Sequence, residues 1–272
     1  MKVDLHVHSN HSDGVYSPKE VIKIAKKEGI GCLALTDHNC IAGIPEALKA
    51  GEKFDVEVIP GVEILSDCSE ILGYYIDFKD KKLKDYLKKV QKGVDKTARI
   101  FIRILNKAGY ALSYKKIERI YGYPLMRIHV LYYLRSKEPK KEQQKKFQEM
   151  RKETYYPKGK FYFKIRQDRA EKVIKIIKKA GGIPVLAHPW FEKGFEKRVP
   201  SLVRAGLQGI EINSPGKNES DINKINKLCK RYNIIKTGGN DFHSDYVNPF
   251  NKEYYCGYDT VEKFKKLNKD GQ

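Results

Sequence analysis

Histidine and acidic residues gather in four short clusters that lie far apart along the 272-residue chain. The clusters are Asp4-Leu5-His6-Val7-His8 with Asp13, Thr36-Asp37-His38, Ala187-His188-Pro189 and Asn240-Asp241-Phe242-His243, with His129 alone between them. Imidazole and carboxylate ligands together suit Zn, Mn or Fe, and several ions need many such groups to converge in space. The distribution therefore predicts one polynuclear metal site.

The first cluster has the spacing of a strand. His6 and His8 alternate along it, so both side chains project from the same face and can hold one ion together. An HxH pair alone is weak evidence, because two histidines can also be packed or hydrogen-bonded beside a sheet. The turn that follows is rich in small and acidic residues and can bring Asp13 back to the same place. His11, in that turn, is expected to be an exposed turn residue rather than a ligand.

The second cluster ends an apolar strand abruptly with polar groups, where a purely structural strand end more often has Gly, Pro or Asn. His38 is therefore predicted to be a ligand. Asp37 is predicted to be catalytic or to orient a ligating imidazole, as outer carboxylates commonly do. Glu63 lies inside an apolar run, where a lone buried carboxylate is costly. Cations would relieve that cost, and a salt bridge is the alternative.

The last two clusters repeat this pattern. His188 ends the apolar run that precedes Pro189, and Asp241 and His243 stand at strand spacing after a pair of glycines. Taken alone, each histidine could be a satisfied core residue. Their value as candidate ligands comes from their position at the ends of predicted strands.

The elements that must position these residues are strands alternating with helices. Apolar, β-rich runs recur at Val3–Val7, Cys32–Leu35, Val56–Ile59, Ile71–Ile76, Ile183–Leu186, Gly209–Ile212 and Ile234–Thr237. Helical patterns separate most of them, among them a helix opened by the capping box Ser17-Pro18-Lys19-Glu20 and helices over Ala170–Ala180, Lys197–Ala205 and Asp221–Tyr232. This alternation predicts a parallel sheet, and the continuously apolar runs indicate burial on both faces. Chemistry in such folds lies at the C-terminal ends of strands, where all candidates except His129 fall.

The alternation breaks after Asp77, where helical periodicity replaces the β signal. Helices are expected over Lys82–Ala108, Tyr114–Ile120, Leu125–Leu134 and Pro139–Arg151. Residues 79–165 contain 26 Lys and Arg against 8 Asp and Glu, a net charge of +18, whereas the rest of the chain has a net charge of +2. Such a field attracts polyanions, most commonly nucleic acid. A solvated helical surface is the alternative interpretation.

Composition narrows the class of protein further. Hydrophobic residues make up 40% of the chain, and no apolar run approaches the ~18 residues that a membrane span needs. The N-terminus enters a strand pattern at once, so a cleaved signal peptide is not expected and a cytoplasmic location is the default. Five cysteines without a CxxC pair suit a reducing compartment.

In the order DLHVHSNHSDG, LTDHN, PGVEI, LAHP and NDFH, these segments resemble the polymerase and histidinol phosphatase (PHP) superfamily of phosphoesterases. The helical insertion with Arg127-Ile128-His129 is similar to that of the subgroup that includes nucleoside 3′,5′-bisphosphate phosphatases and 5′-to-3′ RNA exonucleases. The resemblance implies an α/β fold, a distorted (β/α)7 TIM-like barrel with an inserted helical subdomain. Residues 1–78 and 166–272 would form a discontinuous catalytic barrel, and residues 79–165 a basic helical insertion covering the active-site mouth.

The same resemblance implies three divalent metal ions (Mn, Zn or Fe) and their ligands. One ion would take His6, His8, Glu63 and Asp241; a second would take Glu63, His129 and His188; a third would take Asp13, His38 and His243. One position departs from the pattern, because many relatives carry a histidine where this chain has Glu70, just before the Leu-Gly of the fourth strand. That departure bears on a neighbouring substrate contact and therefore on the exact substrate.

The expected reaction is hydrolysis of a phosphate ester by a metal-bound hydroxide. Arg127 would hold nonbridging phosphate oxygens, for which a guanidinium fork is well shaped, and an exposed helix charge is the alternative. The basic segment favours a phosphorylated small molecule, a nucleotide or the 5′ end of short RNA as substrate. Histidinol phosphate is the alternative ester, and a nucleic-acid-binding module without catalysis is the alternative outside enzymes.

Overall fold

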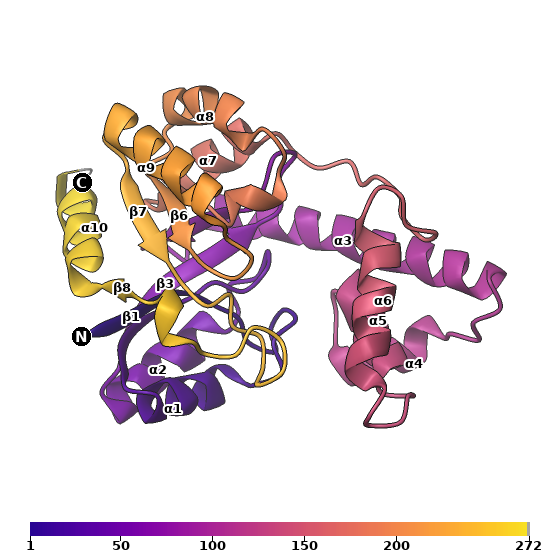
Figure 1. Cartoon of the computed structure of the whole chain (residues 1–272). Helices are drawn as coiled ribbons and strands as arrows, with labels where there is room; N and C mark the ends of the chain where they lie inside the picture. The colour runs from indigo at the N-terminus through magenta and orange to yellow at the C-terminus, as the bar shows by residue number, and fades with distance from the viewer. Residues whose placement is uncertain (271–272) are drawn as a thin grey trace. The chain divides into compact units, whose positions relative to one another are not determined.

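The structure is a computed structural model that describes residues 1–270, and these residues divide into two compact units. Unit 1 comprises Met1–Asp85 and the chain from Gln167 on, and unit 2 comprises Tyr86–Arg166. Figure 1 shows the strands of unit 1 with their flanking helices, and the helices α3 to α6 in the magenta and rose colours of the middle of the chain.

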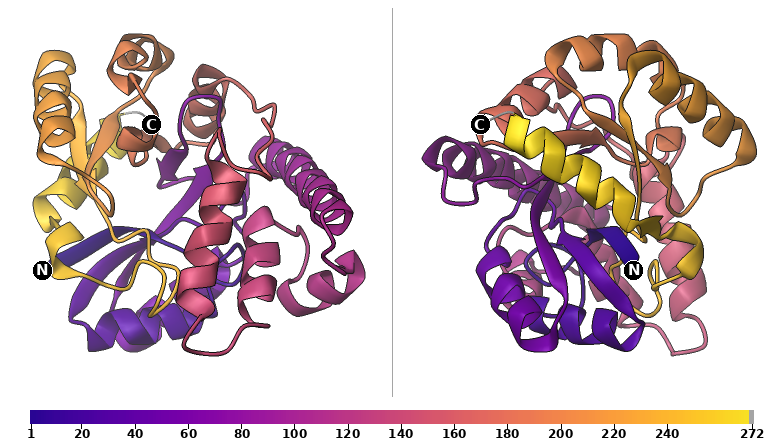
Figure 2. Two further views of the ribbon diagram at one scale, coloured as in Figure 1. Left: turned by 45° about the vertical axis from the view of Figure 1, so that its right-hand side comes forward. Right: turned by 90° about the vertical axis from the view of Figure 1, so that its left-hand side faces the viewer.

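One eight-stranded sheet forms the centre of unit 1, in the order β7-β6-β5-β4-β3-β2-β1-β8. Its strands are β1 (Lys2–Val7), β2 (Ile30–Leu35), β3 (Glu57–Ile64), β4 (Ile71–Tyr74), β5 (Ile183–Leu186), β6 (Gly209–Asn213), β7 (Ile235–Gly238) and β8 (Cys256–Gly257). The chain after β7 returns to the end of β1, where the His8 N–H donates to the Phe242 carbonyl at 2.9 Å. Val7 and Phe242 form a parallel bridge there, so the sheet is a nearly closed, barrel-like structure (Figure 2).

The prediction of a parallel sheet is wrong at two places. β4 is antiparallel to both β3 and β5, and β8 is antiparallel to β1. For β4 the cause is chain length, because residues 65–70 are too few for the crossover that parallel neighbours require. β3 also runs further than predicted, to Ile64, so Glu63 lies inside this strand rather than after it. β3 pairs with β2 up to Pro60 and with β4 from Gly61 onward.

Both faces of the sheet are buried, as the continuous apolar runs predicted. In β2, Cys32 and Ala34 belong to one core cluster, whereas Leu33 belongs to a second cluster. The second cluster includes the apolar faces of α1 (Pro18–Lys27) and α2 (Ile44–Phe54), which lie side by side next to β1 in Figure 1. The first cluster takes Val261 and Phe264 from α10 (Tyr258–Asp270), drawn in yellow in Figure 2.

The remaining helices of unit 1 are α7 (Ala170–Lys179), α8 (Val199–Ala205) and α9 (Glu219–Tyr232), close to the predicted ranges. Short 3-10 turns cover Pro189–Phe191, Phe195–Lys197 and Lys252–Tyr254. The predicted capping box of α1 is present, since the Ser17 hydroxyl accepts from the Glu20 N–H and Glu20 accepts from the Ser17 N–H. Neither α2 nor α10 was predicted.

Unit 2 is helical, as predicted. It holds α4 (Tyr114–Tyr121), α5 (Arg127–Arg135), α6 (Gln143–Tyr155) and most of α3 (Lys81–Lys107), which begins in unit 1. Buried Asp95 joins three segments of this unit: it accepts from Arg99 Nε at 2.8 Å, from the Leu125 N–H at 3.2 Å and from the Tyr114 hydroxyl. A single carboxylate thus fixes the chain that leads into α5.

Among residues 1–270, none of the helices combines the length and the apolar character needed to cross a bilayer. All five cysteines are free thiols, four of them buried and Cys256 half-buried.

Candidate metal centre

Side chains from the ends of distant strands converge at one place in unit 1. Their possible ligand atoms form three overlapping groups, and within each group the atoms lie within 4.8 Å of one another. The groups are His8, Asp13, His38 and His243; His6, His8, Glu63 and Asp241; and His38, Glu63 and Glu70. His188 joins them through Nε2, which is 3.0 Å from Glu63 Oε1. Of the nine predicted ligands, eight are therefore brought together within unit 1.

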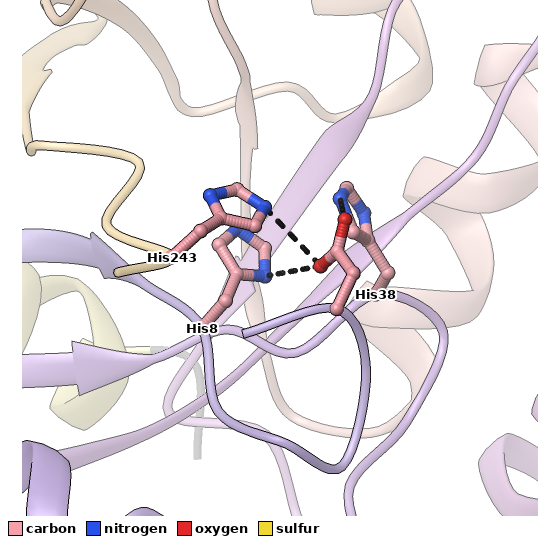
Figure 3. Close-up of side chains that lie close together, drawn as sticks. His8, His38 and His243 are labelled. Carbon is pink, nitrogen blue, oxygen red and sulfur yellow. Dashed lines mark ion pairs between the residues drawn. The ribbon is translucent and has the colours of Figure 1, made fainter. Parts of the chain in front are cut away.

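In the first group, three histidines surround the carboxylate of Asp13. Figure 3 labels these histidines, His8, His38 and His243. Asp13 Oδ1 lies 3.1 Å from His243 Nε2 and 3.9 Å from His8 Nδ1, and Asp13 Oδ2 lies 3.7 Å from His38 Nε2. The ring centroids of His8 and His243 are 4.3 Å apart. Three imidazoles and one carboxylate thus face a common point.

The second group combines two histidines, His6 on β1 and His8 directly after it, with two carboxylates, Glu63 and Asp241. His6 Nε2 is 3.2 Å from Glu63 Oε2 and 3.4 Å from Asp241 Oδ1. His8 Nε2 is 3.4 Å and 3.1 Å from the same two oxygens. Donor atoms that share one ion at roughly 2.0–2.2 Å lie roughly 3.0–3.5 Å from one another. The spacing in this group is therefore that of ligands around one divalent ion.

Buried polar atoms without partners provide a test of whether the centre fits metal ions. Within residues 1–270, no hydrogen bond reaches His6 Nε2, His8 Nδ1, Asp13 Oδ1, His38 Nδ1, Glu63 Oε2 or His188 Nδ1, all of which are buried atoms. A buried polar atom left unpaired costs about 1–3 kcal/mol. All but His188 Nδ1 face the shared centre through the contacts given above or through His38 Nδ1, 3.0 Å from Glu63 Oε2. Divalent cations would satisfy them, so the donor set fits metal.

Without metal ions, the carboxylates of the centre favour the protonated form of two of its histidines. Burial acts to lower the pKa of His243, but the charges of Asp13 and Asp241 outweigh it and raise that pKa to about 9. At His188, burial also acts to lower the pKa, but the hydrogen bond and the charge of Glu63 outweigh it and raise that pKa to about 9. The pKa of His8 is lowered, first by burial and then by the charges of His243 and His38.

Comparison with known proteins agrees with this arrangement. Residues 4–183 match the PHP domain family. This chain belongs to the PHP domain family. It is 31% identical over 253 residues to a 3′,5′-nucleoside bisphosphate phosphatase of Chromobacterium violaceum, covering 89% of this chain and 87% of that protein. It is 30% identical over 252 residues to a 5′-3′ exoribonuclease of Haemophilus influenzae, covering 89% and 90%.

Solved structures share the fold. An amidohydrolase from Chromobacterium violaceum, with bound sulfate and no metal, has a TM-score of 0.82 and 28% identity over 94% of this chain and 92% of that one. A protein of Bifidobacterium adolescentis has a TM-score of 0.86 at 22% identity, over 96% and 94%, which speaks to the fold alone. The predicted PHP-type, distorted TIM-like barrel with a helical insertion is confirmed. The chain is a metal-dependent PHP phosphoesterase.

Glu211, on β6, belongs to the PHP centre and was missed in the sequence. Its Oε1 lies 3.1 Å from His6 Nδ1, and its Oε2 accepts the His188 N–H at 2.8 Å. A carboxylate behind a ligating imidazole fixes the ring and its tautomer. The signal that could have found it is a lone acid in the apolar run 209–212, the same pattern that identified Glu63.

The contacts of Asp37 are to the turn that follows β1. Its Oδ1 accepts from the Ser9 N–H and the Ser12 hydroxyl, and its Oδ2 accepts from the Ser9 hydroxyl, each at 2.7 Å. Within the described chain no hydrogen bond joins it to an imidazole, so the prediction that it orients one is wrong. Instead it holds the turn that carries Asp13. His11, in the same turn, is half-buried and outside the three groups.

The backbone at the centre is strained where two predicted ligands leave their strands. His188 has φ +26° and Asp241 has φ +50°, a left-handed conformation that side chains rarely adopt and that costs about 1–3 kcal/mol per residue. Gly239 has a related constraint, because a Cβ there would lie 2.5 Å from the His6 backbone nitrogen. The close approach of this loop to β1 brings Asp241 beside His6 and His8.

His129 and Arg127 belong to unit 2, and the contacts that follow are those that they make within this unit. His129 is buried, its Nδ1 accepts the Met126 N–H at 3.1 Å, and its ring stacks on Tyr121 at 5.2 Å between centroids. The Arg127 guanidinium lies over the Tyr155 ring at 4.6 Å, and its buried Nη1 has no hydrogen-bond partner within residues 1–270. Arg127 is half-buried rather than an exposed helix charge.

Proposed function

We propose that this protein hydrolyses phosphate esters of nucleotides or of the 5′ end of short RNA, using three divalent ions of Mn, Zn or Fe. The main support is the convergence of eight candidate ligands around buried, unpartnered polar atoms. When bound, the ions supply an activated water and neutralise charge on both the attacking and leaving oxygens.

The chain's own residues hold and orient this centre. His6, His8, Glu63 and Asp241 would hold one ion, and Asp13, His38 and His243 another. Glu63 and His188 would contribute to the remaining one, together with the predicted ligand His129 or another side chain. Glu211 keeps His6 and the backbone of His188 in place, and Asp37 keeps the turn of Asp13 in place.

The substrate class is supported by the chemistry of residues 79–165, where the net charge is +18. Arg127 carries a buried N–H without a partner in the described chain, and a guanidinium is well suited to phosphate oxygens. We propose that Arg127 binds the substrate phosphate and that this basic insertion brings its field to the mouth of the centre. Relatives named as a 3′,5′-nucleoside bisphosphate phosphatase and a 5′-3′ exoribonuclease support the same substrate class.

The test is a phosphoester panel with protein loaded with Mn²⁺ or Zn²⁺. We expect turnover of a nucleoside 3′,5′-bisphosphate or a 5′-phosphorylated oligoribonucleotide to exceed that of histidinol phosphate. The His8→Ala variant should be inactive, whereas His11→Ala, a histidine outside the three groups, should keep activity. Preference for histidinol phosphate would overturn the substrate class. Salt-sensitive RNA binding without hydrolysis of any ester would make binding the function.

A further inference from the structure

Glu70 lies directly before β4 and belongs to the third candidate group, with His38 and Glu63. Its Oε1 is 3.2 Å from His38 Nδ1, and its Oε2 is 3.5 Å from His188 Nε2. Glu63 approaches the same two nitrogen atoms, each at 3.0 Å. Two carboxylates therefore flank the same pair of imidazoles, one from inside β3 and one from the start of β4.

Among the described residues, every ion-pair partner of Glu63 and Glu70 is a histidine, and no Lys or Arg pairs with either. His38 Nδ1 and Glu63 Oε2 are 3.0 Å apart, yet neither atom has a hydrogen-bond partner among the described residues. Glu63 is fully buried, and His188 is 6% exposed. Glu63 Oε1 and His188 Nε2 make a hydrogen bond at 3.0 Å, whereas His38 Nδ1 and Glu63 Oε2 converge without one, which is the arrangement expected of ligands around a cation.

We propose that Glu70 is a metal ligand which, with Glu63 and His188, completes the second ion position from unit 1 alone, and that it biases this position toward Mn²⁺ over Zn²⁺. The proposal rests on the three-ion centre proposed above. Carboxylates suit hard ions such as Mn²⁺, whereas imidazole suits Zn²⁺. A position with two carboxylates and one imidazole therefore favours Mn²⁺ more than one with a second imidazole would.

The contacts of His129 favour this assignment. Its Nδ1 accepts the Met126 N–H, so in the neutral ring the proton lies on Nε2. A ligating imidazole has the opposite arrangement, with its far nitrogen donating to an acceptor. In its observed environment, His129 is suited to donate to an anion such as a phosphate oxygen, and Glu70 takes the ligand position predicted for it.

The experiment measures metal binding rather than activity. Metal-free full-length protein is titrated with Mn²⁺, followed by electron paramagnetic resonance of the free ion, and equilibrated with Mn²⁺ and Zn²⁺ together for elemental analysis. The variants are Glu70→Gln, Glu70→His and His129→Ala. Glu171→Gln is the matched control, since this glutamate of unit 1 is similarly exposed, 17% against 21%, and pairs with Arg198 outside the centre.

We expect Glu70→Gln to weaken one equivalent of Mn²⁺ by at least about 10-fold, the loss that even an outer contact to a ligand produces. Glu70→His should retain that equivalent but lower its ratio of Mn²⁺ to Zn²⁺. His129→Ala and Glu171→Gln should bind as the unchanged protein does. Full Mn²⁺ binding by Glu70→Gln, or loss of one equivalent in His129→Ala, would overturn the proposal. If the wild-type protein binds metal through Glu70 but hydrolyses no ester, the proposed function is wrong and the assignment of Glu70 as a ligand stands.

Discussion

The two units of this protein place their charges in opposite ways. In unit 1, carboxylates and imidazoles are buried together, and Glu63 alone lies within 3.4 Å of nitrogen atoms from four histidines. In the stretch that contains unit 2, residues 79–165, 26 basic residues outnumber 8 acidic ones, and most lie on the surface. Buried charge demands fixed geometry, whereas exposed charge acts as a field. A single substitution in the metal centre should therefore remove most of the activity, whereas each substitution on the basic surface should weaken substrate binding only slightly.

The largest effect is expected for Glu63→Gln. This change keeps the shape of the side chain but removes the charge that two candidate ion positions share, so kcat should fall by about 1,000-fold or more if several kcal/mol of charge stabilisation is lost. Steady-state kinetics on a nucleoside bisphosphate, with elemental analysis of bound metal, measures it.

Glu57→Gln is the matched control, because Glu57 lies in the same strand but pairs with Lys265 at 2.8 Å. It should keep near-normal turnover. If Glu63→Gln retained activity and metal, the centre would not depend on buried charge, and the contrast between the units would disappear.

Much of this centre could be predicted because its parts are local. Strand-end histidines and lone acids in apolar runs are visible in any short window, and seven strands and the helices of the insertion follow from periodicity. The functions of Glu211 and Asp37 could not, because they depend on partners that only folding brings close: Glu211 contacts His6 across 205 positions. The antiparallel direction of β4 could not be predicted either. It is set by a short connection, which periodicity does not record.

Protons should compete with metal at the centre. Burial alone would lower the pKa values of His188 and His243, but neighbouring carboxylates raise both to about 9, so both rings carry a proton at pH 7 in the metal-free protein. Metal binding must release these protons, and the two rings belong to different ion positions, so the apparent affinity for Mn²⁺ at each of these two positions should rise with pH by up to about 10-fold per unit below pH 9 and level off above it. Calorimetry at pH 7 in buffers of different ionisation enthalpy counts the released protons. A count of zero would contradict this description.

A smaller effect is expected for Arg127→Ala in unit 2. Loss of a charged hydrogen bond to phosphate, worth about 1.5–3 kcal/mol, should raise KM by about 10- to 100-fold. The control is Arg151→Ala, which removes the same charge from an exposed position of α6. If the two variants behaved alike, Arg127 would act through the field of the unit rather than through contact.

The smallest effect should come from the surface itself. Replacing exposed Lys140, Lys141 and Lys145 by Gln should weaken binding of a short oligoribonucleotide by a few-fold and lower the dependence of log K on log salt by up to about 0.7 per lost phosphate contact. Hydrolysis of a mononucleotide at saturation should hardly change, because no candidate ligand is altered. The control replaces Lys175, Lys178 and Lys179, which lie exposed on α7 of unit 1 and carry the same total charge. Since a screened field decays within about 10 Å at 0.1 M salt, only lysines near the bound strand should matter. Equal losses in both triple variants would mean that RNA responds to the net charge of the whole chain, and unit 2 would then have no special part in substrate choice.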